Sequence, residues 1–286
     1  MARVAVVTDS STCLPSTLVD KLGIVTVPVT VHLPGSDGID GSDHLSRRLS
    51  EAIERDQYVR SSHPFITDYL AAIEEAECEH VVVVTPATEF AAMFRNASLA
   101  SELTSRHALV VDSRTAAAGE ALVVLAGAEA AAAGEPLESV VAAIEEACRN
   151  VDLVATLATL DPLRRSRRVP SPILSRSSLD GVHSLFRMRL GSVELLEEVE
   201  SEQTAFEAIR GAFEAGGGQT ASRSTVFHAD SPEAAERLCG LIGEVDFVSG
   251  FSAAMQLHTG PGVVGVAWLP GGRGSSRGAV VDIAGG

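Results

Sequence analysis

Residues 4–15 read VAVVTDSSTCLP: an apolar run, then hydroxyl and carboxylate side chains, then a proline that suits the start of a helix. A short apolar run of this kind predicts a buried strand. In an open α/β sheet the carboxyl end of a strand faces the N-terminus of the next helix, and ligands with a negatively charged end bind there. The stretch therefore predicts an α/β fold with a ligand site close to Thr8, Asp9 and Ser10.

The same order of strand, polar residues and helix recurs along the chain. Strand-like runs at 81–84, 108–111 and 225–227 each lead into short polar side chains. Helix capping alone is enough to explain any one of these polar residues. The alternation predicts βαβ units and a mainly parallel sheet with flanking helices for a first domain, residues 1–149. Residues 150–286 contain a hairpin-like pair of segments and predict a second α/β domain with a mixed sheet, so a small-molecule site is expected in the cleft between the domains.

Three stretches give further local predictions. Residues 24–33 are rich in β-branched side chains and predict one strand, with Pro28 at an edge or a bulge. Residues 34–38 predict a turn. The alanine-rich run at 115–133 carries two glutamates and predicts a helix that lies close against a sheet, not a membrane span.

Composition excludes several classes of protein. The chain has 286 residues, of which 45% are hydrophobic and 21% charged, and this is ordinary for a two-domain globular protein. A net charge of −16 argues against a nucleic-acid binder or an anionic-membrane binder, because phosphate contacts need a basic face. The four cysteines are far apart, and no signal-peptide pattern precedes the first strand. We therefore expect a cytoplasmic protein with no nucleic-acid partner and no stable membrane insertion.

Standard catalytic motifs do not occur in the sequence. It has no P-loop, no zinc-protease helix and no nucleophile elbow. Residues 260–265 match G-x-G-x-x-G, but they precede an apolar strand instead of a helix, so we reject a dinucleotide site. The eight histidines show no metal-ligand spacing. We expect no catalytic residue, no metal and no cofactor.

Several motifs, taken together and in order, resemble the DegV family. They are VVTDSS at 6–11, SSHP at 61–64, VDS at 111–113, the segment 159–169 and HTGPG at 258–262. Members of this family are bacterial two-domain α/β proteins that bind a long-chain fatty acid between their domains, and some are the acyl-carrying subunit of a fatty acid kinase. The resemblance implies a lipid-binding protein that is not itself an enzyme, with a fatty acid as ligand and a fatty acid kinase as partner.

The resemblance also implies a carboxylate-binding site. Ser61 and Ser62 match the family's Thr-Ser pair, expected here at the start of a helix over 64–76, and His258 matches a histidine near the head group. Ala91 stands where the family usually has a serine that contacts the carboxylate. A lost neutral hydrogen bond costs about 0.5–1.5 kcal/mol, so a different lipid or a shifted head group stays open. Secondary candidates for the site are Thr8, Asp9, Ser10, Thr88 and Thr259.

The segment 163–169 departs from the family pattern. It reads LRRSRRV, where the family tends to have Leu-x-x-Gly-Gly-Arg-Ile, and Arg168 keeps the arginine. In the family this region lies near the site mouth and the kinase-facing surface, so a basic patch here would suit an anionic head group or an acidic partner. A solvated helix end is an equally good interpretation. Residues 279–284 are expected either as a last edge strand or as a disordered tail.

Two other functions stay open at this point. An α/β enzyme acting on a small acid or a phosphorylated substrate would use Asp9, Ser10 and His258 as acid, nucleophile and base, and these residues would then have to converge. A divergent family member could instead bind no lipid and act only through partners.

Overall fold

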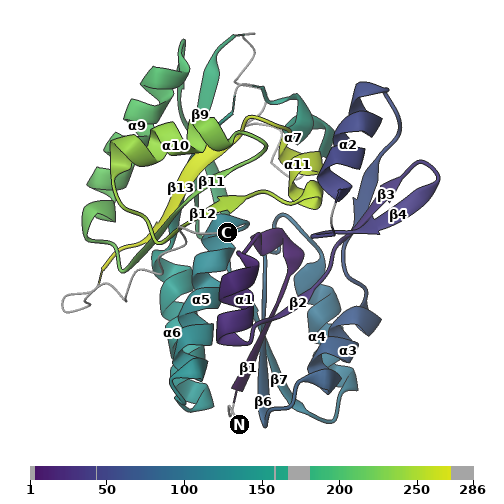
Figure 1. Cartoon of the computed structure of the whole chain (residues 1–286). Coiled ribbons are helices and arrows are strands. Elements are labelled where there is room, and N and C mark those ends of the chain that lie inside the picture. The colour runs from purple at the N-terminus through teal and green to yellow at the C-terminus, as the bar shows by residue number, and fades with distance from the viewer. Residues whose placement is uncertain (1–3, 43, 158, 167–180, 272–286) are drawn as a thin grey trace.

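The structure is a computed structural model, and it describes residues 4–42, 44–157, 159–166 and 181–271 (Figure 1). Helices and strands alternate along the chain around two large sheets and one small sheet. The first large sheet is parallel and the second is mixed, so the predicted α/β class with these two kinds of sheet is confirmed. Arg168 and the strand expected at 279–284 lie outside the described residues.

The first sheet consists of four parallel strands in the order β2-β1-β6-β7. They span Val25–Val27 (β2), Val4–Asp9 (β1), His80–Thr85 (β6) and His107–Asp112 (β7). All of β1 is buried, as expected for a parallel strand with helices on both faces of its sheet. These helices are α1 (Ser16–Leu22), α3 (Ile66–Glu75), α4 (Met93–Leu103), α5 (Ala118–Ala132) and α6 (Leu137–Asn150).

A small antiparallel sheet, in the order β4-β3-β5, is a feature that the sequence analysis does not predict. Its strands are Thr30–Leu33 (β3), Ser36–Ile39 (β4) and Arg60–Ser62 (β5), and α2 (Leu45–Glu54) packs against it.

This sheet shows that two local predictions are wrong and that a third is right only in part. Residues 24–33 form two strands in different sheets, because Pro28 has no N–H to offer a ladder and the chain changes direction there. The turn predicted at 34–38 is present at Pro34 and Gly35 but is shorter than predicted, because β4 begins at Ser36. Ser61 and Ser62 lie on strand β5 and not at a helix start, since the next helix begins only at Ile66.

The second large sheet has the order β10-β9-β8-β13-β11-β12. Its strands are Asp152–Leu157 (β8), His183–Arg189 (β9), Ser192–Val199 (β10), Arg223–His228 (β11), Phe247–Gly250 (β12) and Val264–Leu269 (β13). Only β11 and β12 pair in parallel. The helical segments that accompany this part are α7 (Asp161–Ser166), α9 (Glu202–Ala215), η2 (Gly218–Thr220), α10 (Pro232–Ile242) and α11 (Ala253–Thr259).

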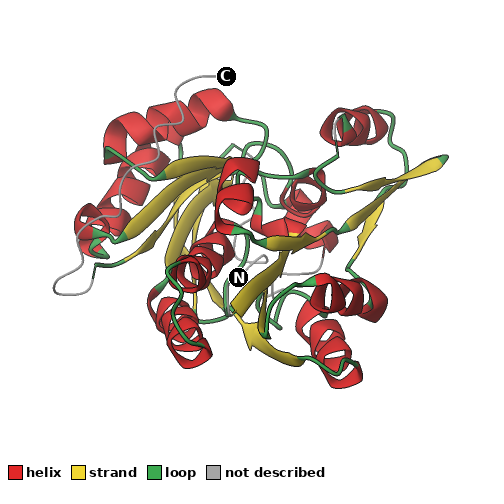
Figure 2. Cartoon of the chain, turned by 60° about the horizontal axis from the view of Figure 1, so that its bottom comes forward, coloured by secondary structure: helices red, strands yellow, loops and turns green. Residues whose placement is uncertain are grey.

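Helix α5 joins the two large sheets. It packs against β1 and β6 of the first sheet and against β8, β11 and β13 of the second, and Figure 2 shows helices lying between the two sheets. Most of its residues are buried, which explains why its sequence is alanine-rich with no polar face. One apolar cluster consequently runs from Val6 through Leu122 to Phe227, so the two halves of the chain share a core.

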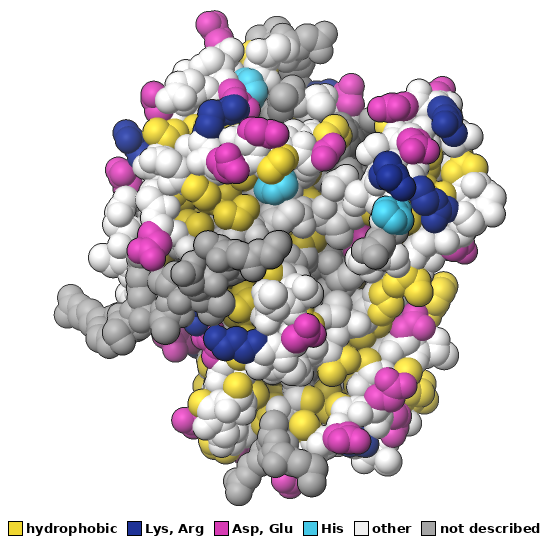
Figure 3. Space-filling view, in the orientation of Figure 1, with side chains coloured by type: hydrophobic (Ala, Val, Ile, Leu, Met, Phe, Trp, Pro, Cys, Tyr) yellow, Lys and Arg dark blue, Asp and Glu magenta, His cyan; other side chains and the backbone are white. Residues whose placement is uncertain are grey.

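The surface carries charge of both signs. Figure 3 shows acidic side chains spread over the molecule in this view, and basic side chains both on the lobe of α2, β3 and β4 and at separate places elsewhere on this face. Arg47 and Arg48 of α2 are exposed on this lobe. Within the described ranges, no helix is long and apolar enough to cross a membrane.

Candidate functional site

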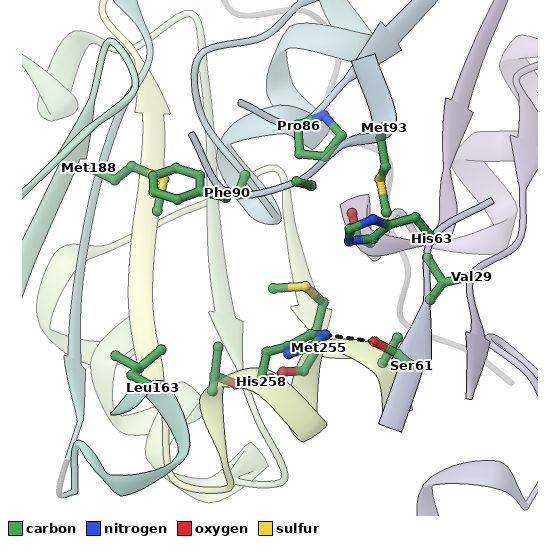
Figure 4. Close-up of a pocket in the computed structure, with 15 residues that line it drawn as sticks. Val29, Ser61, His63, Pro86, Phe90, Met93, Leu163, Met188, Met255 and His258 are labelled. Atoms are coloured by element: carbon green, nitrogen blue, oxygen red, sulfur yellow. Dashed lines mark hydrogen bonds between the residues drawn. The ribbon is translucent and has the colours of Figure 1, made fainter. Parts of the chain in front are cut away.

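A pocket opens where β5, the N-terminal end of α5 and helix α11 approach one another (Figure 4). Its empty space is about 700 Å³, part of which is open to solvent, and this lies within the range typical of small-molecule sites. The described residues that line it are Ser11, Val29, Ser61, His63, Pro86, Phe90, Ala91, Met93, Ala116, Leu163, Met188, Ala254, Met255, His258 and Thr259. Ser61 and His63 lie on one side of this pocket, while Phe90 and Met188 lie on the opposite side.

A second pocket of about 610 Å³ adjoins the first, and the two share five lining residues. Its walls come mainly from the second sheet and are apolar except for Thr259. The described residues that line it are Ala116, Ala117, Leu153, Ala155, Leu157, Leu163, Phe186, Met188, Val193, Phe227, Phe251, Met255, Thr259 and Val263. Together the described walls of the two pockets are mainly apolar, with Ser61, His63 and His258 in the first pocket and Thr259 in the part that the two pockets share.

The polar end is organised by a hydrogen bond between Ser61 and His258. Their Oγ and Nε2 atoms lie 2.8 Å apart, although the residues are 197 positions apart in the sequence. Ser61 is held in place because β5 pairs with β3, opposite Val31. His258 lies in the last turn of α11, which is capped at its start by Ser252. When His258 donates to Ser61, the hydroxyl proton of Ser61 remains available to a ligand.

Ser62 is placed differently from its neighbour. Adjacent residues on a strand point to opposite faces, and Ser62 Oγ lies 2.9 Å from His32 Nε2. The other ring nitrogen of His32 lies 2.8 Å from Asp37 Oδ1. Ser62 is not among the described residues that line either pocket.

Of the other residues predicted for the site, some line the first pocket and one does not. Ala91 and Thr259 line the first pocket, and Thr259 Oγ1 donates to the carbonyl of Met255 at 3.0 Å. Thr88 is exposed, and its hydroxyl donates to Asp112 Oδ2 at 3.0 Å. Thr88 therefore does not replace the hydroxyl that Ala91 lacks in this arrangement.

Asp9 lies behind the pocket wall. It is fully buried, and its Oδ1 atom accepts hydrogen bonds from the backbone N–H and the hydroxyl of Ser11, at 2.9 and 2.5 Å. The pKa of Asp9 is raised from 3.8 to about 6. Burial is the main cause and the charge of Asp40 adds to it, while the hydrogen bonds from Ser11 lower the pKa. Asp9 is thus hydrogen-bonded to Ser11, which is a lining residue of the pocket.

The acid, nucleophile and base of the enzyme alternative do not come together. Ser10 Oγ donates to Asp40 Oδ2 at 2.8 Å, whereas His258 pairs with Ser61. Thr8 is buried within the first sheet, next to Asp9. Among the described residues, no group of three or more His, Cys, Asp or Glu side chains could hold a metal ion.

Sequence reasoning missed much of the apolar wall. Met188 of β9, Met255 of α11 and Phe251 line the pockets, but apolar residues on strands and helices are the same signal that any core gives. Ser11 follows the first strand directly after Asp9 and Ser10, so the same pattern that indicates those two residues also indicates Ser11. The G-x-G-x-x-G match at 260–265 is a turn that leads into β13, as predicted, and does not open a helix.

Comparison with known proteins identifies the family. The model of the DegV family, described as a family of uncharacterised proteins, matches residues 3–271. The chain belongs to the DegV family. A DegV domain-containing protein of Streptomyces coelicolor is 29% identical over 275 residues, which cover 92% of this chain and 97% of the relative. A corresponding protein of Mycobacterium tuberculosis is 28% identical over 271 residues, covering 92% and 96% of the two chains.

Solved structures of DegV proteins share the fold. A DegV family protein from Thermus thermophilus, described by its fatty acid binding, superposes with a TM-score of 0.85 at 26% identity and covers 94% of this chain and 99% of its own. DegV of Bacillus subtilis, described as a fatty acid binding protein, superposes with a TM-score of 0.82 at 22% identity, covering 95% and 100%. The recognition of the DegV family from the sequence motifs is thereby confirmed.

Proposed function

We propose that this protein binds a long-chain fatty acid, with the acyl tail in the two adjoining apolar pockets and the carboxylate beside Ser61 and His258. The observation that carries the proposal is the composition of the site, two adjoining and mainly apolar pockets, the first of which is lined by a hydrogen-bonded Ser–His pair. The fatty acid binding described for the Thermus thermophilus relative supports it.

The apolar pockets supply most of the affinity in this proposal. A tail of about sixteen carbons gains roughly 0.8 kcal/mol per buried methylene, or about 10 kcal/mol before the costs of binding. The walls suit this tail because they are formed by residues such as Leu153, Phe186 and Val193. Met188 and Met255, which line both pockets, have flexible side chains that adapt to tails of different shape.

The polar end has to bind a carboxylate that leaves water. A buried carboxylate without hydrogen-bond donors would forfeit much of the gain from its tail. Ser61 can donate when His258 donates to it, and a protonated His258 would also favour the negative charge. Ala91 lines this end without offering a hydroxyl, so we expect weaker binding of the head group than a serine at this position would give.

The finer parts of the proposal concern the partner. We infer that the protein is not an enzyme itself and presents the carboxylate of its fatty acid to a fatty acid kinase. We further place the protein in the cytoplasm. All four cysteines are unpaired in the structure, which fits a reducing compartment.

Native mass spectrometry of freshly purified protein, followed by extraction and identification of bound molecules, tests the proposal. We expect about one fatty acid per chain. Ser61→Ala should weaken binding of added fatty acid about fivefold, in line with the loss of one hydrogen bond. Ser62→Ala makes the same change on the neighbouring residue, whose side chain contacts His32, and should leave affinity unchanged. Protein that is empty and takes up no added fatty acid would overturn the proposal.

A further inference from the structure

Asp40 connects segments of the chain that are far apart in the sequence. It follows β4 and its carboxylate is buried, with 5% of the residue exposed. Its Oδ2 atom accepts a hydrogen bond from Ser10 Oγ at 2.8 Å, and its Oδ1 atom accepts one from the backbone N–H of Ala254 at 3.0 Å. Each oxygen is therefore bonded to a different segment.

One side of this network supports the strand that carries Ser61. Ser10 Oγ accepts from the backbone N–H of Val29 at 3.0 Å, and the backbone N–H of Asp40 donates to the carbonyl of Val29 at 2.8 Å. Val29 directly precedes β3, and β3 pairs with β5, where Val31 lies opposite Ser61. The position of Ser61 thus depends on the bonds that fix the beginning of β3.

The other side supports the helix that carries His258. Ala254 lies in the first turn of α11, and His258 lies in the last turn of the same short helix. A buried carboxylate bonded to this turn fixes where α11 begins, and with it the side chain one turn further on. Both ends of the Ser61–His258 hydrogen bond are consequently connected to the same carboxylate.

We propose that Asp40 is a positioning residue that sets the distance between Ser61 and His258, and so shapes the head-group end of the pocket. The functional part of this inference rests on the proposed binding of a fatty acid. Asp40 does not touch the ligand space itself, since it is not among the described lining residues.

A double-mutant cycle on fatty-acid affinity separates positioning from general stabilisation. Asp40→Asn keeps the shape of the side chain, but only its amide oxygen can accept a hydrogen bond, so it cannot accept from both Ser10 and Ala254 as the carboxylate does. We expect Asp40→Asn and His258→Ala each to weaken binding about tenfold, and the double variant to weaken it by less than about thirtyfold, because the first change already misplaces His258. An additive loss of about a hundredfold would overturn the inference.

Ser249→Ala is the matched control, because it removes a different hydrogen bond at the same junction, from Ser249 Oγ to the carbonyl of Cys13 at 2.6 Å. Its loss of affinity, if any, should be additive with that of His258→Ala. Should Asp40→Asn fail to fold, Ser10→Ala removes one arm of the same network and is expected to show the same lack of additivity.

Hydrogen–deuterium exchange of the ligand-free variants gives a readout that does not need a fatty acid. Asp40→Asn should speed exchange in residues 60–62 and 253–259 about tenfold and leave α6 unchanged. Unchanged exchange in both segments would overturn the inference. Faster exchange in a protein that binds no fatty acid would instead overturn only the proposed function.

Discussion

Asp9 gives the most specific prediction for stability. It is fully buried, its Oδ1 atom is bonded to Ser11, and its Oδ2 atom is also buried and has no hydrogen-bond partner among the described residues. Burial raises its pKa from 3.8 to about 6 in the folded protein. Between these two values the folded state keeps a proton on Asp9 that the unfolded state has released, so the contribution of Asp9 to stability falls as pH rises through this window and does not change above it.

The size of the effect follows from the two pKa values. A shift of one pKa unit corresponds to about 1.4 kcal/mol, so the ionised form of Asp9 lowers the free energy of unfolding by about 3 kcal/mol at neutral pH. Asp9→Asn removes this titration, while the amide oxygen still accepts both bonds from Ser11. We therefore expect the variant to be more stable than the wild type at neutral pH, by up to about 3 kcal/mol. This advantage should shrink to nearly nothing at about pH 4.

Urea unfolding of both proteins, followed by circular dichroism at a series of pH values, measures this difference. The exposed Asp20→Asn is a control for the chemical change itself. The reasoning is refuted if Asp9→Asn is less stable than the wild type at neutral pH, or if the difference between them does not change between about pH 4 and about pH 7.

Four further changes have defined outcomes. Ala91→Ser should restore a hydroxyl to the head-group end and strengthen fatty-acid binding about threefold by calorimetry, with no gain contradicting the placement of the carboxylate there. Gly265→Ala should lower the free energy of unfolding by about 2 kcal/mol, because its Cβ would lie 2.5 Å from a backbone carbonyl of the neighbouring strand. Gly240→Ala, which meets open space within α10, should instead stabilise the protein in the same urea titration. Arg187→Met should lower the free energy of unfolding by about 3 kcal/mol, because it leaves the buried carboxylate of Asp152 without its partner; thermal melts that match the wild type would contradict this.

Several features of the fold could be predicted because they are local. The strands at 81–84 and 108–111 are apolar runs too short for helices, and the alanine-rich segment has the composition of a helix packed on all sides. The small antiparallel sheet could not be predicted in this way. Two of its strands, β4 and β5, are short and mostly polar, and the third, β3, is the part of the predicted strand 24–33 that lies beyond Pro28.

The candidate site, too, could be predicted from the sequence only in part. Polar residues at the end of the first strand and the motifs around Ser61 and His258 indicated which parts of the chain belong to the site. The apolar tail pocket could not be predicted, because residues such as Met188 and Phe186 show the same pattern as other core residues. They line an open space only because the tertiary structure brings residues of β8, β9 and α11 together around it.

The α/β class, the family and the serine and histidine motifs follow from the sequence alone, since these depend on composition, local periodicity and residue order. Which of the two serines faces the pocket follows from the tertiary structure instead. On a strand, neighbouring side chains point to opposite faces, so the pairing of β5 with β3 sets Ser61 against His258 and Ser62 against His32. The hydrogen bond between Ser61 and His258 joins residues that lie 197 positions apart in the chain, so no local pattern in the sequence predicts it.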